Sequence, residues 1–255
     1  MSELEFDFEN VIAEIDALNK LVGNFCQPRS KSVLPELIST LRSIRGNEAN
    51  RSWPWGIKEN NQFFTDISRG AYQPDEQGGD NVFAEITSTW EVRRIAPKKR
   101  SAQAERFKLI GNASTRVRLH REVPAGAALE ELAMWRAEIG DSASPGCHFH
   151  VQVLGDKEHP PYPKSLDVPR FPGLIVTPAG VVEYVLSELF QDRWLQHLST
   201  QRADLDRWWP IQKKYLGAVL GWQLKVVNGS SSGSPWGTLK KAKPNARLFL
   251  EEQLA

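Results

Sequence analysis

The sequence predicts an α+β fold in which a small, mainly antiparallel sheet is flanked by N-terminal and C-terminal helices. Two observations lead to this prediction. Apolar residues recur at helical spacing near both ends of the chain, whereas apolar and polar residues alternate from Val82 onward, as in a half-buried strand. The chain has 255 residues, 40% of them hydrophobic and 25% charged, which is the composition of an ordinary globular protein.

The N-terminal part, residues 1–50, is predicted to be a helical pair. Its apolar residues are spaced by three or four positions over residues 9–22 and again over residues 33–45. Gly46 and Asn47 follow the second run and end it. Residues 51–81 have neither helical nor strand periodicity, and we expect them to form a long irregular loop.

Three strands are predicted next, beginning at Val82, at residues 106–110 and at residues 115–121. In the third strand Thr115, Val117 and Leu119 should face the core, so that Arg116, Arg118 and His120 face outward. The spacing of Leu129, Leu132, Trp135 and Ile139 before Gly140 predicts a helix over residues 128–139. Residues 51–176 are thus expected to form an α+β core with long loops.

The C-terminal part, residues 177–255, is predicted to be helical with a basic tail. Thr177 and Pro178 are typical of the start of a helix, here one of about twenty residues. A further helical region around residues 205–220 should be interrupted at Pro210, and Pro244 should begin a short terminal helix. The three parts are expected to pack as one compact unit.

Charge is strongly segregated along the chain although the net charge is only +1. Residues 93–121 contain ten Lys or Arg and one acid, and residues 207–247 contain eight and no acid, whereas the first 22 residues have six acids and one lysine. Such a layout can attract a polyanion to one side of a protein, although it can also reflect acidic and basic segments that pack together.

Tryptophans accompany the C-terminal cations, since five of the nine lie in the last third of the chain. Aromatic rings among cations suit single-stranded nucleic acid, where bases stack and phosphates pair, and they suit protein interfaces equally well. The candidate binding residues are Arg93, Arg94, Lys98, Lys99, Arg100, Arg116, Arg118, Trp208, Trp209, Trp236, Lys240 and Lys241.

A short histidine motif is the candidate for chemistry. In residues 147–153, His148, His150 and Gln152 should share one strand face and could hold a divalent metal, or the histidines could be structural. The two histidines separated by Phe149 resemble the central strand of the HUH-type endonucleases. This resemblance implies a metal on His148 and His150, with Tyr184 attacking a DNA phosphodiester, and Tyr215 is the second tyrosine candidate. The implied third metal ligand is Gln152, Glu85, Glu91 or Glu188.

Other chemistries lack their motifs. There is no GxxxxGK(S/T) phosphate loop, no GxGxxG turn and no Asp or Glu followed two residues later by Lys. Cys26 and Cys147 have no metal or disulfide spacing. No apolar run is long enough to span a membrane, and the acidic start lacks secretory features, so we expect a cytoplasmic protein.

Three functional hypotheses follow. The first is recognition of an anionic partner, with nucleic acid as the favoured class, through a basic face of the sheet and the basic, Trp-containing C-terminal segment. The second is metal-dependent cleavage of single-stranded DNA at His148 and His150, as the resemblance implies. The third is a non-catalytic subunit that binds other proteins. The expected cofactor is either none or a divalent metal.

Overall fold

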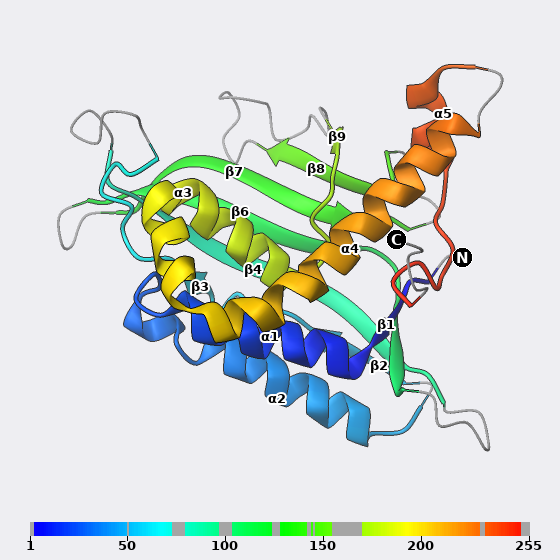
Figure 1. The fold of residues 1–255 in the computed structure, drawn as a ribbon, viewed down its shortest axis with the longest axis horizontal. Helices are drawn as coiled ribbons and strands as arrows, with labels where there is room; N and C mark the ends of the chain where they lie inside the picture. Colours follow the sequence, from blue (N-terminus) through cyan, green and yellow to red (C-terminus); the bar gives the residue numbers. More distant parts are fainter. Residues whose placement is uncertain are drawn as a thin grey trace.

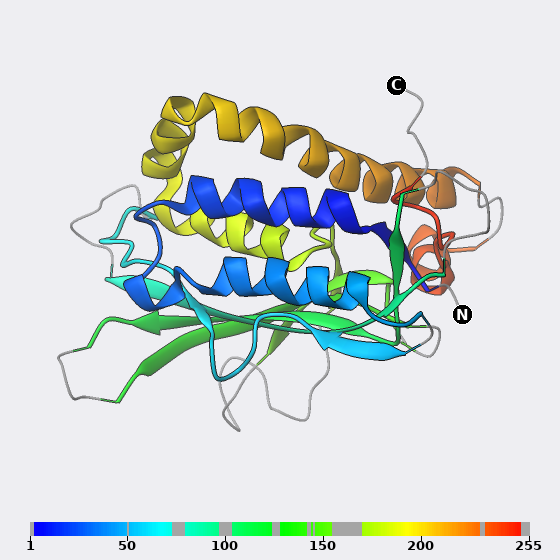
Figure 2. The same ribbon diagram turned by 90° about the horizontal axis from the view of Figure 1, so that it is seen from below.

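The computed structural model describes residues 3–49, 51–72, 80–96, 104–123, 128–141, 144, 146–154, 170–229 and 233–250. Within these residues the chain forms a nine-stranded antiparallel sheet and five α-helices, which confirms the predicted α+β class. Helices α1 to α4 lie on one face of the sheet, α4 is the farthest of them from it, and α5 lies at one end of the molecule (Figures 1 and 2). The sheet therefore has an inner face toward the helices and an outer face away from them.

The strand order is β1-β5-β4-β6-β7-β8-β9, and β2 and β3 also pair with β4. The strands are β1 (Glu5–Asp7), β2 (Ser52–Trp55), β3 (Phe63–Phe64), β4 (Val82–Arg94), β5 (Arg106–Leu109), β6 (Ala113–Arg121), β7 (Glu130–Ile139), β8 (Phe149–Leu154) and β9 (Arg170–Pro172). The helices are α1 (Phe8–Val22), α2 (Val33–Gly46), α3 (Pro178–Thr200), α4 (Arg202–Asn228) and α5 (Pro235–Lys241), with a 3₁₀ turn at Pro28–Ser30.

The N-terminal helical pair is confirmed. Asp7 begins α1 by accepting hydrogen bonds from the backbone N–H groups of Glu9 and Asn10, a standard N-cap arrangement. The expected loop over residues 51–81 is wrong in part, because β2 and β3 lie within it. Their backbones pair with the long strand β4, an environment that periodicity in such short segments cannot reveal.

The predicted helix at residues 128–139 is wrong, because these residues form β7. Trp135 lies opposite Val117 of β6 and Val153 of β8, so the segment is a central strand with partners on both sides. Two residues of the supposed helical stripe, Leu129 and Leu132, are exposed. The hydrogen-bonding groups of β6 and β8 require a strand between them, and this requirement outweighs a local spacing that fits a helix.

The C-terminal helices follow the prediction at α3 and differ after it. The Thr177 side chain caps α3 by accepting a hydrogen bond of 3.0 Å from the Gly180 backbone N–H. The predicted interruption at Pro210 is wrong, since α4 continues through this exposed residue. The predicted helix start at Pro244 is also wrong, because α5 begins at Pro235 and ends at Lys241.

The core lies between the sheet and the helices and draws residues from all three parts of the chain. Within it, a buried carboxyl group ties three helices together. Glu14 of α1 accepts hydrogen bonds from the Thr177 hydroxyl (2.5 Å) and from the Gln212 side-chain amide of α4 (2.6 Å). Burial raises the pKa of Glu14 to about 7, although both hydrogen bonds act to lower it.

No helix in the described part of the chain is both long enough and apolar enough to cross a membrane.

Candidate functional site

The arginines of the outer sheet face are held in ion pairs with acids from neighbouring elements. Arg118 of β6 contacts Glu85 of β4 at 3.0 Å and Glu131 of β7 at 3.5 Å. Arg116 lies 3.5 Å from Glu59 in the β2–β3 connection. The antiparallel register places Glu85 directly opposite Arg118, so the acid reaches the basic row from a different part of the sequence.

The remaining predicted cations of the sheet also have partners where the structure describes them. Arg93 of β4 donates to the Ser52 hydroxyl at 3.0 Å. Arg94 contacts Glu105 at 2.9 Å and donates to the backbone oxygen of Asn47. Lys98, Lys99 and Arg100 lie outside the described residues. The basic row that charge counting predicted is therefore interleaved with acids in the folded protein.

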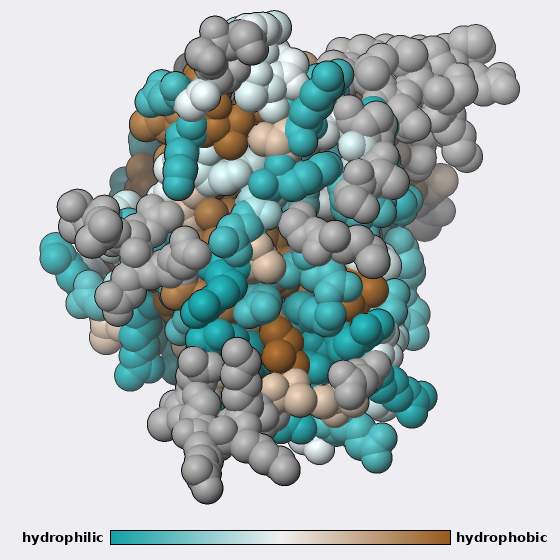
Figure 3. Space-filling view, turned by 90° about the vertical axis from the view of Figure 1, so that its right-hand side faces the viewer, coloured by the Kyte–Doolittle hydropathy of each residue, from teal (hydrophilic) through white to brown (hydrophobic). Residues whose placement is uncertain are grey.

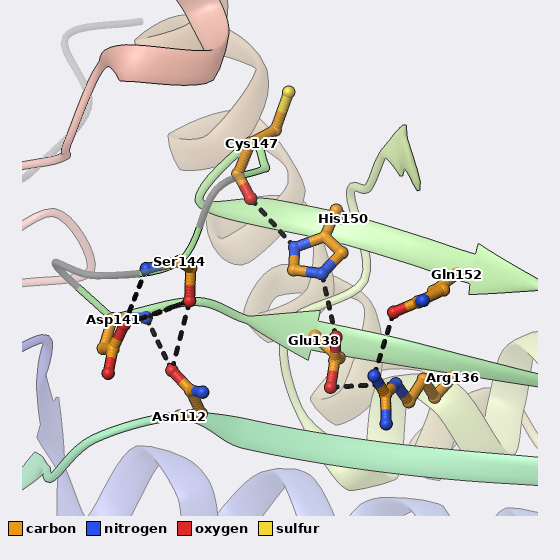
Figure 4. Close-up of polar contacts among 8 residues, drawn as sticks. All are labelled: Asn112, Arg136, Glu138, Asp141, Ser144, Cys147, His150 and Gln152. Atoms are coloured by element: carbon orange, nitrogen blue, oxygen red, sulfur yellow. Dashed lines mark hydrogen bonds and ion pairs between the residues drawn. The ribbon is translucent and has the colours of Figure 1, made fainter. Parts of the chain in front are cut away.

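His150 belongs to a polar network on the outer face of β7 and β8 (Figure 4). One ring nitrogen lies 2.8 Å from the Cys147 backbone oxygen, and the other lies 2.8 Å from the Glu138 carboxylate. Arg136 contacts the same carboxylate at 3.0 Å and donates to Gln152 at 2.9 Å. Both ring nitrogens of His150 are therefore engaged in contacts within the protein.

His148 differs from His150 although it is only two residues away. Its side chain is buried, and neither ring nitrogen has a hydrogen-bond partner among the residues that the structure describes. The ring meets Phe149 edge-on at 4.9 Å and Trp222 of α4 at 6.5 Å. Burial lowers the pKa of His148 to about 4, and the positive charge of Lys243 adds to this effect. At neutral pH the imidazole is therefore uncharged.

The structure does not bring the elements of the endonuclease hypothesis together. Tyr184 of α3 packs edge-on against Trp135 at 5.8 Å and lines a cavity with Val151 and Val153, on the inner face of β8. His150 points to the outer face of the same strand. Tyr215 is buried in the core, where its ring contacts Phe6 and Phe249.

No three His, Cys, Asp or Glu side chains are grouped for metal binding within the described ranges. Metal binding by His148, His150 and Gln152 and catalysis by Tyr184 stay predictions.

The predicted C-terminal residues divide into buried and exposed ones. Trp208 is part of the core, with 3% of its surface exposed, whereas Trp209 and Trp236 are 63% and 68% exposed. Lys240 and Lys241 lie at the exposed end of α5. Figure 3 looks at the side of the molecule that includes α5, where hydrophilic residues predominate. We call Arg207, Trp209, Lys213, Lys214, Lys225, Trp236, Lys240 and Lys241 the α4–α5 surface.

The sequence patterns did not lead us to two features of the structure. One is the buried Glu14, whose position between Val11 and Leu18 on the apolar side of α1 was a usable signal. The other is the cavity beside Tyr184, which is formed by residues from four strands, a linker and a helix. No local pattern indicates such a cavity.

No protein-family model matches the chain, and searches of the curated proteins and of the solved structures find no similar protein.

Proposed function

We propose that this protein recognises an anionic partner through the α4–α5 surface, and that single-stranded nucleic acid is the partner class that the surface fits best. One observation carries the proposal. The lysines and arginines of this surface form no ion pair within the described ranges, in contrast to the arginines of the sheet. Their charge remains available to phosphates.

The spacing of the α4 cations supports an extended contact. Arg207, Lys214 and Lys225 lie on one flank of α4, because separations of seven and eleven residues each correspond to nearly whole numbers of helical turns. They span about 10 Å and then about 16 Å along the helix axis. Trp209 projects from another side of α4, which it shares with Lys213 four residues later. Trp209 and Trp236 are exposed and offer flat aromatic surfaces on which unpaired bases can stack.

Fluorescence anisotropy with labelled single-stranded DNA and RNA oligonucleotides tests this proposal. Replacing Trp209 and Trp236 together by Ala should weaken binding by roughly tenfold or more, since stacking contributes about 1 to 3 kcal/mol per base. The control is Leu195→Ala, which removes an exposed apolar side chain from α3. Equal affinity of all three proteins, or no binding by the wild type, would exclude this partner class.

A second candidate partner is an acidic helix of another protein, which is favoured by the exposed aliphatic residues of α4. Leu216, Leu220, Leu224 and Val227 form an exposed stripe along α4. Aliphatic side chains offer little to bases but bury well against an amphipathic helix. In the same titrations, replacing Leu220 and Leu224 by Ser should leave oligonucleotide affinity unchanged and should abolish binding of an acidic amphipathic peptide.

We place this recognition in the cytoplasm. Both cysteines, Cys26 and Cys147, are free and buried, as in proteins of reducing compartments.

A further inference from the structure

We propose that the cavity between α3 and the inner face of the sheet binds a small amphiphilic amine, with its apolar body inside and its ammonium group at the mouth. The cavity has a volume of about 420 Å³. Its walls include Leu119, Trp135, Val151 and Val153 of the sheet and Tyr184 and Leu189 of α3. This inference concerns a different part of the molecule from the α4–α5 surface.

The cavity is too large to be a packing defect. Protein interiors contain few voids larger than a water molecule, whereas small-molecule sites usually measure about 300 to 1,000 Å³. Its walls are also well anchored, because β6, β7 and β8 are paired along their lengths and α3 is capped by Thr177. A site of this volume with preformed apolar walls can bury an apolar group without the free-energy cost of opening a cavity first.

The mouth of the cavity determines which head group fits. Tyr184 and Glu188 are four residues apart on α3, so they lie on the same side of the helix, and both are exposed. Burial raises the pKa of Tyr184, and the nearby negative charge of Glu188 raises it further. The Glu188 carboxylate has no ion-pair partner in the described part of the chain. It can therefore receive a cation.

The aromatic wall favours the same head group. Tyr184 and Trp135 meet edge-on with ring centroids 5.8 Å apart. An ammonium group near aromatic rings is attracted by their negative faces, in addition to its attraction to a carboxylate. A fatty carboxylate would instead be repelled by Glu188, and a neutral alcohol would gain neither interaction. The expected order of affinity is thus amine, then alcohol, then carboxylate.

Calorimetric titration with octylamine, octanol and octanoate at neutral pH tests this order. Octylamine should bind at one saturable site and at least tenfold more tightly than octanoate, a difference of about 1.4 kcal/mol. Glu188→Gln should reduce the affinity for octylamine toward that for octanol, leaving only the contribution of the aromatic rings. Val153→Trp should fill the cavity and abolish binding of all three probes, whereas Leu195→Trp, on an exposed part of α3, should change nothing.

Three outcomes would overturn the proposal. They are no saturable binding by the wild type, equal affinity for amine and carboxylate, and unchanged binding in a folded Val153→Trp variant. If that variant does not fold, Leu174→Trp on the linker wall of the cavity provides the same test. An unchanged affinity for octylamine in Glu188→Gln would show that the carboxylate is not the recognition group and would overturn the proposal in the same way.

Discussion

The outer face of the sheet and the α4–α5 surface are both rich in cations, but they differ in whether those cations form ion pairs within the protein. On the sheet, Arg118 lies between Glu85 and Glu131, and Arg116 contacts Glu59. On α4 and α5, exposed lysines stand beside exposed tryptophans without acidic partners among the described residues. The first set of cations is committed to contacts within the protein, whereas the second is available to a partner.

The difference shows why a charge count along the sequence is an incomplete guide to a binding surface. Residues 93–121 have a tenfold excess of bases over acids, and yet antiparallel pairing brings acids from β4 and β7 to the same face. A helix on the outside of the molecule has neighbours on one side only. Its outward charges are neutralised only by residues on the helix itself or by a partner.

The largest effect is expected from Glu14, whose hydrogen bond with Gln212 attaches α4, and with it the α4–α5 surface, to α1. Glu14 has a pKa of about 7 in the folded protein, above its ordinary value of 4.5. Since its folded-state pKa is raised, its favourable contribution is complete below about pH 4.5 and is lost as the pH rises to 7. At about pH 8, Glu14→Gln should therefore raise the free energy of unfolding by up to about 3 kcal/mol.

Urea unfolding of both proteins at about pH 5 and about pH 8 measures this effect. The two proteins should be nearly equally stable at the lower pH and should diverge at the higher one. Asp16→Asn, on an exposed position of the same helix, serves as the control. Parallel stability profiles for wild type and Glu14→Gln would mean that Glu14 does not titrate in this range.

A smaller effect is expected from the sheet, where the comparison assigns the cations a structural role. Glu85→Ala should lower the free energy of unfolding by about 2 to 3 kcal/mol, because it leaves buried His120 without its carboxylate partner and Arg118 with Glu131 alone. Hydrogen bonds from His120 and then Arg118 lower the pKa of Glu85. Its contribution is therefore present above about pH 4.5 and is lost as the pH falls further.

Lys241→Ala is the matched variant on α5, and it should change stability by less than about 0.5 kcal/mol. Guanidinium or urea melts of the two variants compare the regions directly. If Glu85→Ala is as stable as Lys241→Ala, the ion pairs of the sheet do not stabilise the fold, and the contrast between the two regions disappears.

The fold was predictable where the signal lies in neighbouring residues. The spacing of Leu34, Leu37 and Leu41 identifies α2, and Thr177 with Pro178 identifies the start of α3. Residues 128–139 could not be assigned in this way, because their strand conformation is imposed by β6 and β8 on either side. The same holds for β2 and β3, which are too short to have a recognisable period.

The candidate sites were less predictable, because each depends on contacts between distant residues. The sequence places His148 and His150 close together, but it does not reveal that His150 is bonded to Glu138 while His148 has no described partner. It also does not place Tyr184 on the opposite face of the sheet from His150. The cavity beside Tyr184 has walls from residues as far apart as Leu119 and Leu189.

The salt dependence of oligonucleotide binding tests the central contrast most directly. The logarithm of the binding constant should fall linearly with the logarithm of salt concentration, by about 0.7 per single-strand phosphate contact. The double variant Lys240→Ala/Lys241→Ala should reduce the magnitude of this slope by about 1.4. The double variant Arg116→Ala/Arg118→Ala, measured on its folded form, should leave the slope unchanged. A slope reduced by the sheet variant and unaffected by the α5 variant would contradict the account.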